Sequence, residues 1–234
     1  NMAIFRNLQF DAVPVTVMRP PRMTGRDDAL AALRAAWDAR CGALVLGEPG
    51  LGKSRLLTEF STGLQVAWAA GRPGDAGVPY ATLARLLRRL RELHEPVHTL
   101  PQAAALACVL PEQAATSAAP KGDVRLALLA ALEAWLAQAQ HSGLEALVLD
   151  DLHFADAASI EAMQTLIGSE SLSGLRFAFA ARPGEIGAAG EALRNALVEA
   201  RLLEEIALQP LTVGQMTALV ASLGLPELDA EALG

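Results

Sequence analysis

Short apolar runs alternate along the chain with segments whose apolar side chains recur at helical spacing, which predicts buried strands separated by amphipathic helices. The expected strands are 43–46, 65–70, 146–149, 175–180 and 203–208. The expected helices are 26–40, 55–62, 80–93, 102–110, 123–140, 155–167 and 190–199. Because strands that alternate with helices form a parallel sheet covered on both faces, the pattern predicts an α/β fold. We expect a five-stranded parallel sheet with the order 5-1-4-3-2.

The two ends of the chain lack this alternation. Residues 1–22 are poor in helix signals and contain three prolines, which predicts an extended lead-in before a core at 23–209. Residues 210–234 begin a last helical region, and the chain stops inside an expected helix. Asn1 ahead of Met2 is typical of a residue left after tag cleavage. We therefore expect the chain to be a piece of a longer protein.

A glycine-rich turn follows the first apolar run. It has the pattern G-x-x-x-x-G-K-S, the phosphate-binding Walker A loop, between an expected strand and an expected helix. In that place backbone N–H groups and the helix N-terminus face an anion. We expect Lys53 to contact the β- and γ-phosphates and the Ser54 hydroxyl to bind Mg²⁺. The expected nucleotide-binding residues here are Gly47, Glu48, Pro49, Gly50, Leu51, Gly52, Lys53, Ser54 and Arg55.

The alternative for this turn is a glycine-rich loop that matches the pattern by accident. The flanking strand and helix favour a working P-loop. With it, the expected fold becomes that of a P-loop NTPase, and the expected ligands are ATP or ADP with Mg²⁺.

Two carboxylates follow the third apolar run, as in the Walker B pattern. Asp150 and Asp151 end the expected strand 146–149, and ligands of parallel sheets lie at the carboxyl ends of strands. We expect Asp150 to hold Mg²⁺ and Asp151 to polarise the attacking water. The alternative is that these aspartates only cap the following helix, although Asp156 is the simplest candidate for that cap.

Arg182 and His153 are further candidates near the phosphates. Arg182 ends the fourth apolar run, and a strand inserted between the Walker A and Walker B strands would place it beside the γ-phosphate. The alternative is a surface arginine on a turn before Pro183. A metal site at His153 would need more ligands at suitable spacing. We hypothesise instead that His153 transmits position between Asp151 and the rest of the site.

Composition limits the other functions that the chain could have. The net charge is −7, which argues against a broad surface for nucleic acid, and the arginines at 85–91 are expected to form a solvated helix face. Cys41 and Cys108 are isolated, which fits a reducing cytoplasm. No apolar run reaches the roughly 18 residues of a membrane span. We expect a cytoplasmic module that contacts neither nucleic acid nor a membrane.

Taken together, the motifs resemble those of the STAND group of regulatory P-loop ATPases. The residues that carry the resemblance are 23–27, 47–54, 149–156, 180–183 and 208–211. Such AAA-related modules belong to large bacterial transcriptional regulators. Residues 19–22, 72–75 and 78–80 resemble the subtype in which the ATPase follows a bacterial transcriptional activator domain, as in SARP-like regulators.

The resemblance implies a role for further residues and regions. Arg26 would lie near the adenine, Arg182 would be the sensor arginine, and 210–234 would be the start of a truncated helical lid. It implies an ATP-binding, slowly hydrolysing switch of a signal-responsive transcriptional regulator. It also implies DNA-binding, sensor or repeat domains elsewhere in the same chain, and an oligomer that depends on nucleotide.

Three other functions remain open from the residues. A P-loop phosphotransferase acting on a small molecule would need an acceptor pocket and a basic lid, and the acidic pair at 150–151 argues against it. A ring-forming motor would need an arginine that reaches a neighbouring subunit. A module that binds nucleotide without hydrolysing it can be separated from the switch by kinetics alone.

Overall fold

A computed structural model of the chain describes residues 23–96, 100–111 and 123–222. The strands are β1 (Gly42–Leu46), β2 (Val66–Ala70), β3 (Ala146–Asp150), β4 (Arg176–Ala181) and β5 (Leu203–Ala207). The helices are α1 (Asp27–Asp38), α2 (Lys53–Phe60), α3 (Ala81–Leu93), α4 (Leu100–Leu106), α5 (Val124–His141), α6 (Ala157–Ile167), α7 (Gly187–Glu199) and α8 (Val213–Ser222). Short 3₁₀ turns are η2 (Asp75–Gly77), η4 (Leu152–Phe154) and η5 (Glu170–Leu172).

The described chain divides into two units. Residues 28–209 form the unit that holds the sheet, and the described residues on either side of it form a smaller one. In the smaller unit the Gln215 side chain of α8 donates to the Gly25 carbonyl over 3.4 Å. The expected lead-in at 1–22 and the end of the expected lid lie outside the described residues.

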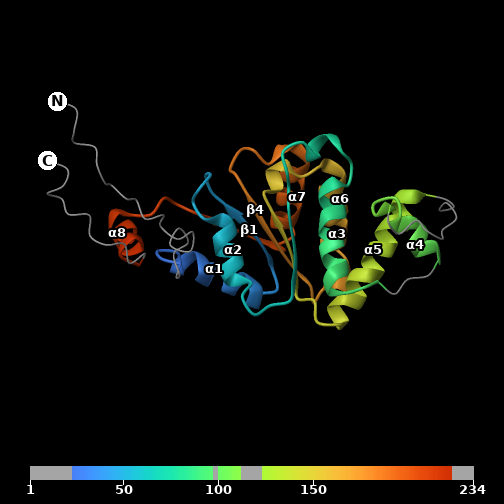
Figure 1. The fold of residues 1–234 in the computed structure, drawn as a ribbon, viewed down its shortest axis with the longest axis horizontal. Coiled ribbons are helices and arrows are strands. Elements are labelled where there is room, and N and C mark those ends of the chain that lie inside the picture. The colour runs from blue at the N-terminus through green and yellow to red at the C-terminus, as the bar shows by residue number, and fades with distance from the viewer. Residues whose placement is uncertain (1–22, 97–99, 112–122, 223–234) are drawn as a thin grey trace, which may run out of the picture. The chain divides into compact units, whose positions relative to one another are not determined.

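The sheet is parallel and has five strands in the order β2-β3-β4-β1-β5. Figure 1 labels two of its neighbouring strands, β1 and β4. This confirms the predicted order, counted from the opposite edge. Because β4 pairs with both β1 and β3, the residues that follow these three strands meet at one edge of the sheet. Those residues include the P-loop, Arg182 and the acidic pair.

Both faces of the sheet are covered. The larger cluster of buried side chains joins one face, including Leu147 and Phe179, to α3, α5, α6 and α7. On the other face, Trp37 of α1 and Phe60 of α2 line an apolar pocket with Val148. All five residues of β3 are buried, as expected for an inner strand covered on both sides. The edge strand β5 instead exposes Glu204 and Glu205.

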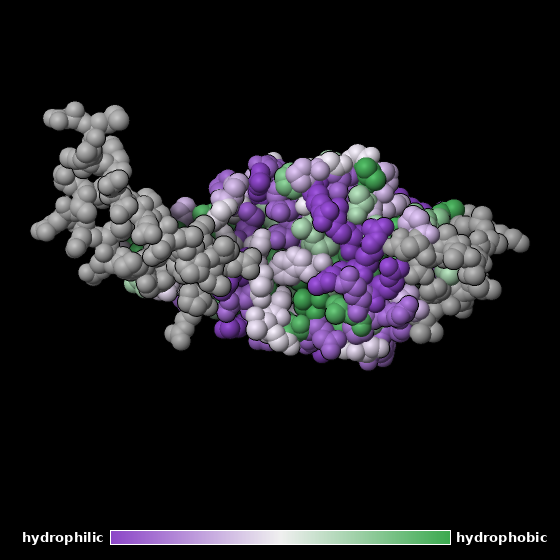
Figure 2. Space-filling model, viewed as in Figure 1, coloured by the Kyte–Doolittle hydropathy of each residue, from purple (hydrophilic) through white to green (hydrophobic). Residues whose placement is uncertain are grey.

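Helix α3 shows the amphipathic pattern that the sequence predicts. Leu83, Leu86, Leu87 and Leu90 are buried, and Arg88 and Arg89 are exposed, whereas Arg85, which was expected on the solvated face, is half-buried in an ion pair with Asp75. Figure 2 shows a mainly hydrophilic surface over much of the region where Figure 1 draws α3. No helix among the described residues is long and apolar enough to span a membrane.

Several expected helix boundaries are wrong by a few residues. The helix expected at 26–40 ends at Asp38, because Arg40 takes a left-handed conformation (φ 61°) and Cys41 N–H bonds back to Ala36 in a Schellman-type cap. The helix expected at 102–110 ends at Leu106, after which the N–H groups of Cys108 and Val109 bond only three residues back, as in a 3₁₀ turn.

The starts of three other helices also differ from the prediction. Helix α2 begins at Lys53 instead of residue 55, directly after the left-handed Gly52. Helix α6 begins at Ala157, because Asp156 is its N-cap. Helix α7 begins at Gly187, three residues before the expected start at 190.

Candidate nucleotide site

The loop between β1 and α2 depends on the conformational freedom of glycine. Gly50 (φ 81°) and Gly52 (φ 89°) both take left-handed conformations, and a Cβ at either would meet no atom within 4 Å. Glycine is therefore required at these two positions by the backbone angle and not by lack of space for a side chain. Gly52 is the N-cap of α2 and has no side chain with which to cap it. The start of α2 is thus suited to an anion.

Lys53 holds the loop together in the described structure. Its side chain is buried, and Nζ donates to the carbonyl oxygens of Gly47 (2.8 Å) and Glu48 (3.1 Å). These bonds place a positive charge inside the curve of the loop. A phosphate oxygen can replace either carbonyl as the acceptor, since both are neutral and hydrogen bonds between charged groups are stronger.

An open cavity of about 280 Å³ lies beside the loop. Its lining residues are Pro49, Gly50, Gly52, Lys53, Ser54, Arg55, Asp151 and Arg182. The fold therefore brings together three sequence-distant parts of the predicted site: the loop, one carboxylate after β3 and the arginine after β4. Glu48 lies on the exposed rim of the loop, and Leu51 is half-buried.

The two carboxylates after β3 differ in their surroundings. Asp150 is buried at the end of the strand, where its Oδ1 accepts the Asp151 N–H over 2.9 Å, and it is not among the cavity-lining residues. Asp151 lines the cavity with a side chain that is 40% exposed. Its backbone is left-handed (φ 47°), a conformation that costs a residue other than glycine about 1 kcal/mol.

The end of β2 supports this turn. The Gly71 N–H donates to the Asp150 carbonyl over 2.9 Å. A Cβ at Gly71 would lie 2.4 Å from the carbonyl oxygen of Asp151, so no side chain fits there. The position of Asp151 is thus fixed by close backbone contact with the neighbouring strand end, which sequence reasoning did not predict.

Arg182, which lines the cavity, also contacts two other side chains. Its Nη1 lies 3.2 Å from Glu185 Oε2, and its guanidinium lies 5.6 Å from the centre of the Phe154 ring. The ion pair and the cation–π contact orient the guanidinium from two sides. Glu185 lies three residues beyond Arg182, and only that spacing could have suggested the pair.

His153 is enclosed directly behind Asp151. Its side chain is 1% exposed, its Nε2 lies 4.0 Å from Asp151 Oδ1, and its ring packs against Phe154 at a tilt of 45° with 4.1 Å between centroids. Within the described residues neither ring nitrogen has a hydrogen-bond partner. Burial lowers the pKa of His153, although the Asp151 carboxylate opposes this effect. The imidazole is therefore neutral near pH 7, beside the predicted catalytic carboxylate.

Arg26 belongs to the smaller unit, and burial lowers the pKa of its guanidinium from the ordinary value. Its expected contact with adenine stays a prediction. Asp156, in contrast, caps α6 as the sequence suggests, with its side chain accepting the Ser159 N–H.

The sheet order and the loop define the fold of a P-loop NTPase. The family model described as AAA ATPase domain matches residues 22–179, which is more than half of the chain. The chain therefore belongs to the AAA ATPase domain family. A comparison with curated proteins found no match.

Among solved structures, the chain is similar to Cdc6p from Pyrobaculum aerophilum, with 15% identity and a TM-score of 0.58. The alignment covers 90% of this chain and 53% of Cdc6p, so the chain spans about half the length of that protein. At this identity the likeness shows the fold.

Two further structures are less similar. ORC1 from Aeropyrum pernix, solved in complex with DNA, has 17% identity and a TM-score of 0.49 over 94% of this chain and 55% of that one. A STAND protein with a tetratricopeptide repeat sensor from Pyrococcus horikoshii has 14% identity and a TM-score of 0.46 over 92% and 27%.

Proposed function

We propose that this chain is the ATP-binding, slowly hydrolysing switch module of a signal-responsive transcriptional regulator. The observation that carries the nucleotide part of the proposal is the cavity shared by the P-loop, Asp151 and Arg182. The regulatory part rests on the resemblance of the motifs to STAND modules and on membership of the AAA ATPase domain family.

The loop residues would bind the phosphates. Nucleotide would replace the bonds from Lys53 Nζ to the loop carbonyls with bonds to β- and γ-phosphate oxygens. The backbone N–H groups at the start of α2 would meet the same phosphates, because Gly52 leaves that helix without a side-chain cap.

The oxygen ligands at this edge fit Mg²⁺. Ser54, which is exposed at the start of α2, and Asp150, at the end of β3, would hold the ion together with phosphate oxygens and water. Asp150 is buried, which favours contact through a water of the ion's shell. Mg²⁺ bound there supplies positive charge that offsets the charge of the phosphates.

Asp151 and Arg182 would act on the attacking water and on the γ-phosphate. The half-exposed Asp151 carboxylate accepts a hydrogen bond from water at the cavity wall and orients it. Arg182 is held by Glu185 and Phe154 and supplies charge-assisted hydrogen bonds to the phosphate. The neutral His153 ring behind Asp151 limits the positions that this carboxylate can take.

The switch requires that the ATP and ADP states differ elsewhere in the protein. We propose that the smaller unit, with Arg26 and α8, responds to the state of the nucleotide. DNA-binding, sensor or repeat domains of the same chain would read that response, and nucleotide-dependent oligomerisation would follow from it. This module would then contact neither nucleic acid nor a membrane itself.

Thermal unfolding tests the nucleotide part first. With Mg²⁺ and ATP or ADP at about 100 times Kd, the free energy of unfolding should rise by roughly 2.7 kcal/mol, a shift of several degrees. Lys53→Ala should abolish this shift. Arg89→Ala removes the same charge from an exposed position on α3 and should keep it.

The outcomes separate the parts of the proposal. Equal stabilisation of Lys53→Ala and the parent by ATP would refute the site. Stabilisation without measurable phosphate release over hours would support nucleotide binding and refute hydrolysis. A phosphorylated acceptor among the products would indicate a phosphotransferase instead.

A further inference from the structure

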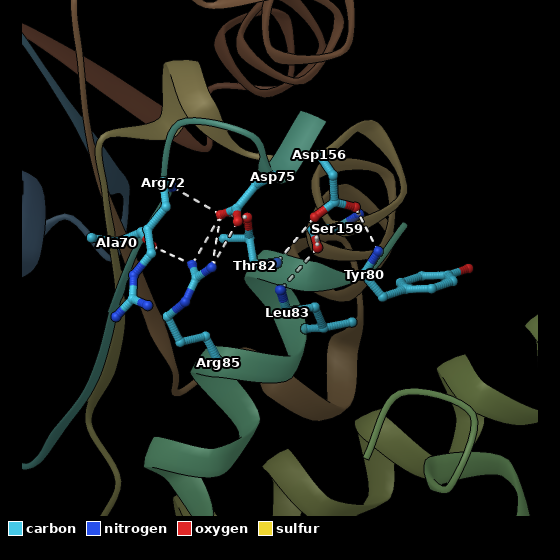
Figure 3. Close-up of polar contacts among 9 residues, drawn as sticks. All are labelled: Ala70, Arg72, Asp75, Tyr80, Thr82, Leu83, Arg85, Asp156 and Ser159. Carbon is cyan, nitrogen blue, oxygen red and sulfur yellow. Dashed lines mark hydrogen bonds and ion pairs between the residues drawn. The ribbon is translucent and has the colours of Figure 1, made fainter. Parts of the chain in front are cut away.

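Two buried carboxylates lie outside the cavity (Figure 3): one bonds within residues 70–85, and the other connects that segment to the start of α6. They are Asp75, in the segment between β2 and α3, and Asp156, the N-cap of α6. Figure 3 shows the Asp75 side chain directed toward Arg72, Thr82 and Arg85, and the Asp156 side chain directed toward Tyr80, Thr82 and Ser159. Neither residue is part of the nucleotide site described above.

Asp156 accepts four hydrogen bonds. Its Oδ1 accepts the N–H groups of Tyr80 (2.7 Å) and Ser159 (2.9 Å). Its Oδ2 accepts the Thr82 N–H (3.1 Å) and the Ser159 hydroxyl (2.7 Å). The Ser159 Oγ in turn accepts the Leu83 N–H over 2.8 Å. One carboxylate therefore serves the N-termini of two helices whose first turns are separated by more than 70 residues in sequence.

Asp75 fixes the segment that leads into α3. It accepts the Arg72 N–H (2.8 Å) and the Thr82 hydroxyl (3.1 Å) and forms an ion pair with Arg85 (2.8 Å). Arg85 also donates to the carbonyl of Ala70 at the end of β2. These contacts give the segment 70–85 one defined conformation.

The same segment touches the turn that carries Asp151. Gly71 contacts the beginning of that turn, through the Asp150 carbonyl and the Asp151 carbonyl oxygen. Asp156 closes its other end. The turn 150–156 is thus attached at both ends to the segment 70–85. A left-handed residue such as Asp151 keeps its conformation only where its surroundings fix it in this way.

From this geometry we propose that Asp156 is a positioning residue for ATP hydrolysis. By binding the start of α3 as well as that of α6, it locks the turn 150–156 to the segment 70–85 and so fixes where the Asp151 carboxylate meets the water. This inference rests on the proposed function, because it assumes that Asp151 orients the attacking water.

A helix cap alone does not require this arrangement. Asp123 caps α5 through a single oxygen that accepts the N–H groups of Arg125 and Leu126, and it is exposed. Asp156 is 1% exposed and uses both oxygens, two of its four bonds going to a different helix. Asp123 is therefore a matched control, with the same residue type and the same capping role away from the turn.

The test compares Asp156→Asn with Asp123→Asn in the whole chain. Asparagine at position 156 keeps one acceptor oxygen and replaces the other oxygen by an NH₂ group, which cannot accept a hydrogen bond from a backbone N–H. The bond from the Tyr80 N–H or the bond from the Thr82 N–H is therefore lost, depending on which way the amide points. We expect both variants to bind ATP with the parent Kd. The kcat of Asp156→Asn should fall roughly tenfold or more, since small displacements of a catalytic group have effects of that size. The kcat of Asp123→Asn should not change.

Hydrogen exchange gives a second readout in the same samples. In Asp156→Asn the amides of Tyr80, Thr82 and the turn 150–156 should exchange faster, whereas those of Asp123→Asn should match the parent there. If Asp156→Asn folds poorly, Ser159→Ala loosens the same junction in part: it removes one of the four bonds to Asp156 and the acceptor of the Leu83 N–H, so kcat should fall in the same direction by a smaller factor, and a parent-like kcat would count against the positioning role.

Three outcomes distinguish the claims. Parent-like kcat in Asp156→Asn, together with faster exchange at Tyr80 and Thr82, would overturn the positioning role and leave the proposed function standing. Equal loss of kcat in both aspartate variants would also overturn it, since the effect would then be one of general stability. A parent chain without any turnover would overturn the proposed function, and with it the positioning role.

Discussion

Replacing His153 by leucine should stabilise the chain and slow hydrolysis at the same time. The ring is 1% exposed, and its two nitrogens have no hydrogen-bond partner among the described residues. A buried polar group without a partner costs about 1–3 kcal/mol on mutational scales. Leucine is apolar and of similar volume, so the free energy of unfolding should rise by roughly 1–2 kcal/mol, which corresponds to about 2–8 °C in Tm.

The stabilisation should depend on pH in a defined direction. Burial lowers the pKa of His153 in the folded chain below the ordinary value of 6.5. Below about pH 6.5 the unfolded chain therefore binds a proton that the folded chain does not, and falling pH destabilises the parent. Leucine removes this effect. The advantage of the variant should then grow as the pH falls from 7.5 toward 5.5.

His94→Leu is the matched control, because His94 Nε2 is also buried and has no partner in the described part of the chain, and His94 does not line the cavity. Both variants should unfold at higher urea concentration, but only His153→Leu should lose turnover, by roughly tenfold, as Asp151 loses the polar imidazole nitrogen that lies 4.0 Å from its Oδ1. Destabilisation of His153→Leu by more than about 1 kcal/mol would refute the reasoning, since it would mean that the nitrogens are hydrogen-bonded in solution.

Two further predictions concern single carboxylates. Asp151→Asn should bind ATP with the parent Kd and lose turnover by roughly a hundredfold, as measured by phosphate release, and a normal rate would place the water-orienting group elsewhere. Asp75→Asn should lower the free energy of unfolding by about 3 kcal/mol, because it leaves the half-buried Arg85 without its charge partner. Burial raises the pKa of Asp75, but hydrogen bonds from Arg72, Arg85 and Thr82 outweigh this effect and lower it. The stability difference between the parent and Asp75→Asn should therefore shrink at low pH, where the parent carboxylate becomes protonated. A difference that does not change with pH would contradict this reasoning.

Local signals were enough to predict the sheet and the loop. Strands β1 to β4 are mainly apolar runs, whereas the edge strand β5 carries Glu204 and Glu205, and the order of the strands was predicted correctly. The P-loop could be predicted because its requirements are local: two left-handed glycines, a lysine and a helix start lie within one short stretch. Helix ends were predicted less well, because left-handed residues such as Arg40 end helices without a glycine to mark them.

Contacts between distant segments could not be predicted in the same way. Gly71 looks like an ordinary turn residue, and its close approach to Asp151 exists only because β2 pairs with β3. Likewise Asp150 and Asp151 are equivalent in sequence, but one is buried and the other faces the cavity. That difference comes from the direction of each side chain at the end of the strand and from the left-handed turn that follows it.

The shared cap at Asp156 follows from topology. Since β2 and β3 are parallel neighbours, the helices that follow them begin side by side at the same edge of the sheet, and each needs acceptors for its first N–H groups. Tyr80, the N-cap of α3, is left-handed and makes no side-chain capping bond. The first N–H groups of α3 therefore need acceptors from the neighbouring helix α6, and Asp156 and Ser159 at the start of α6 supply them. A poor N-cap residue before an amphipathic helix is a sequence signal for such a contact, but the sequence analysis did not use it.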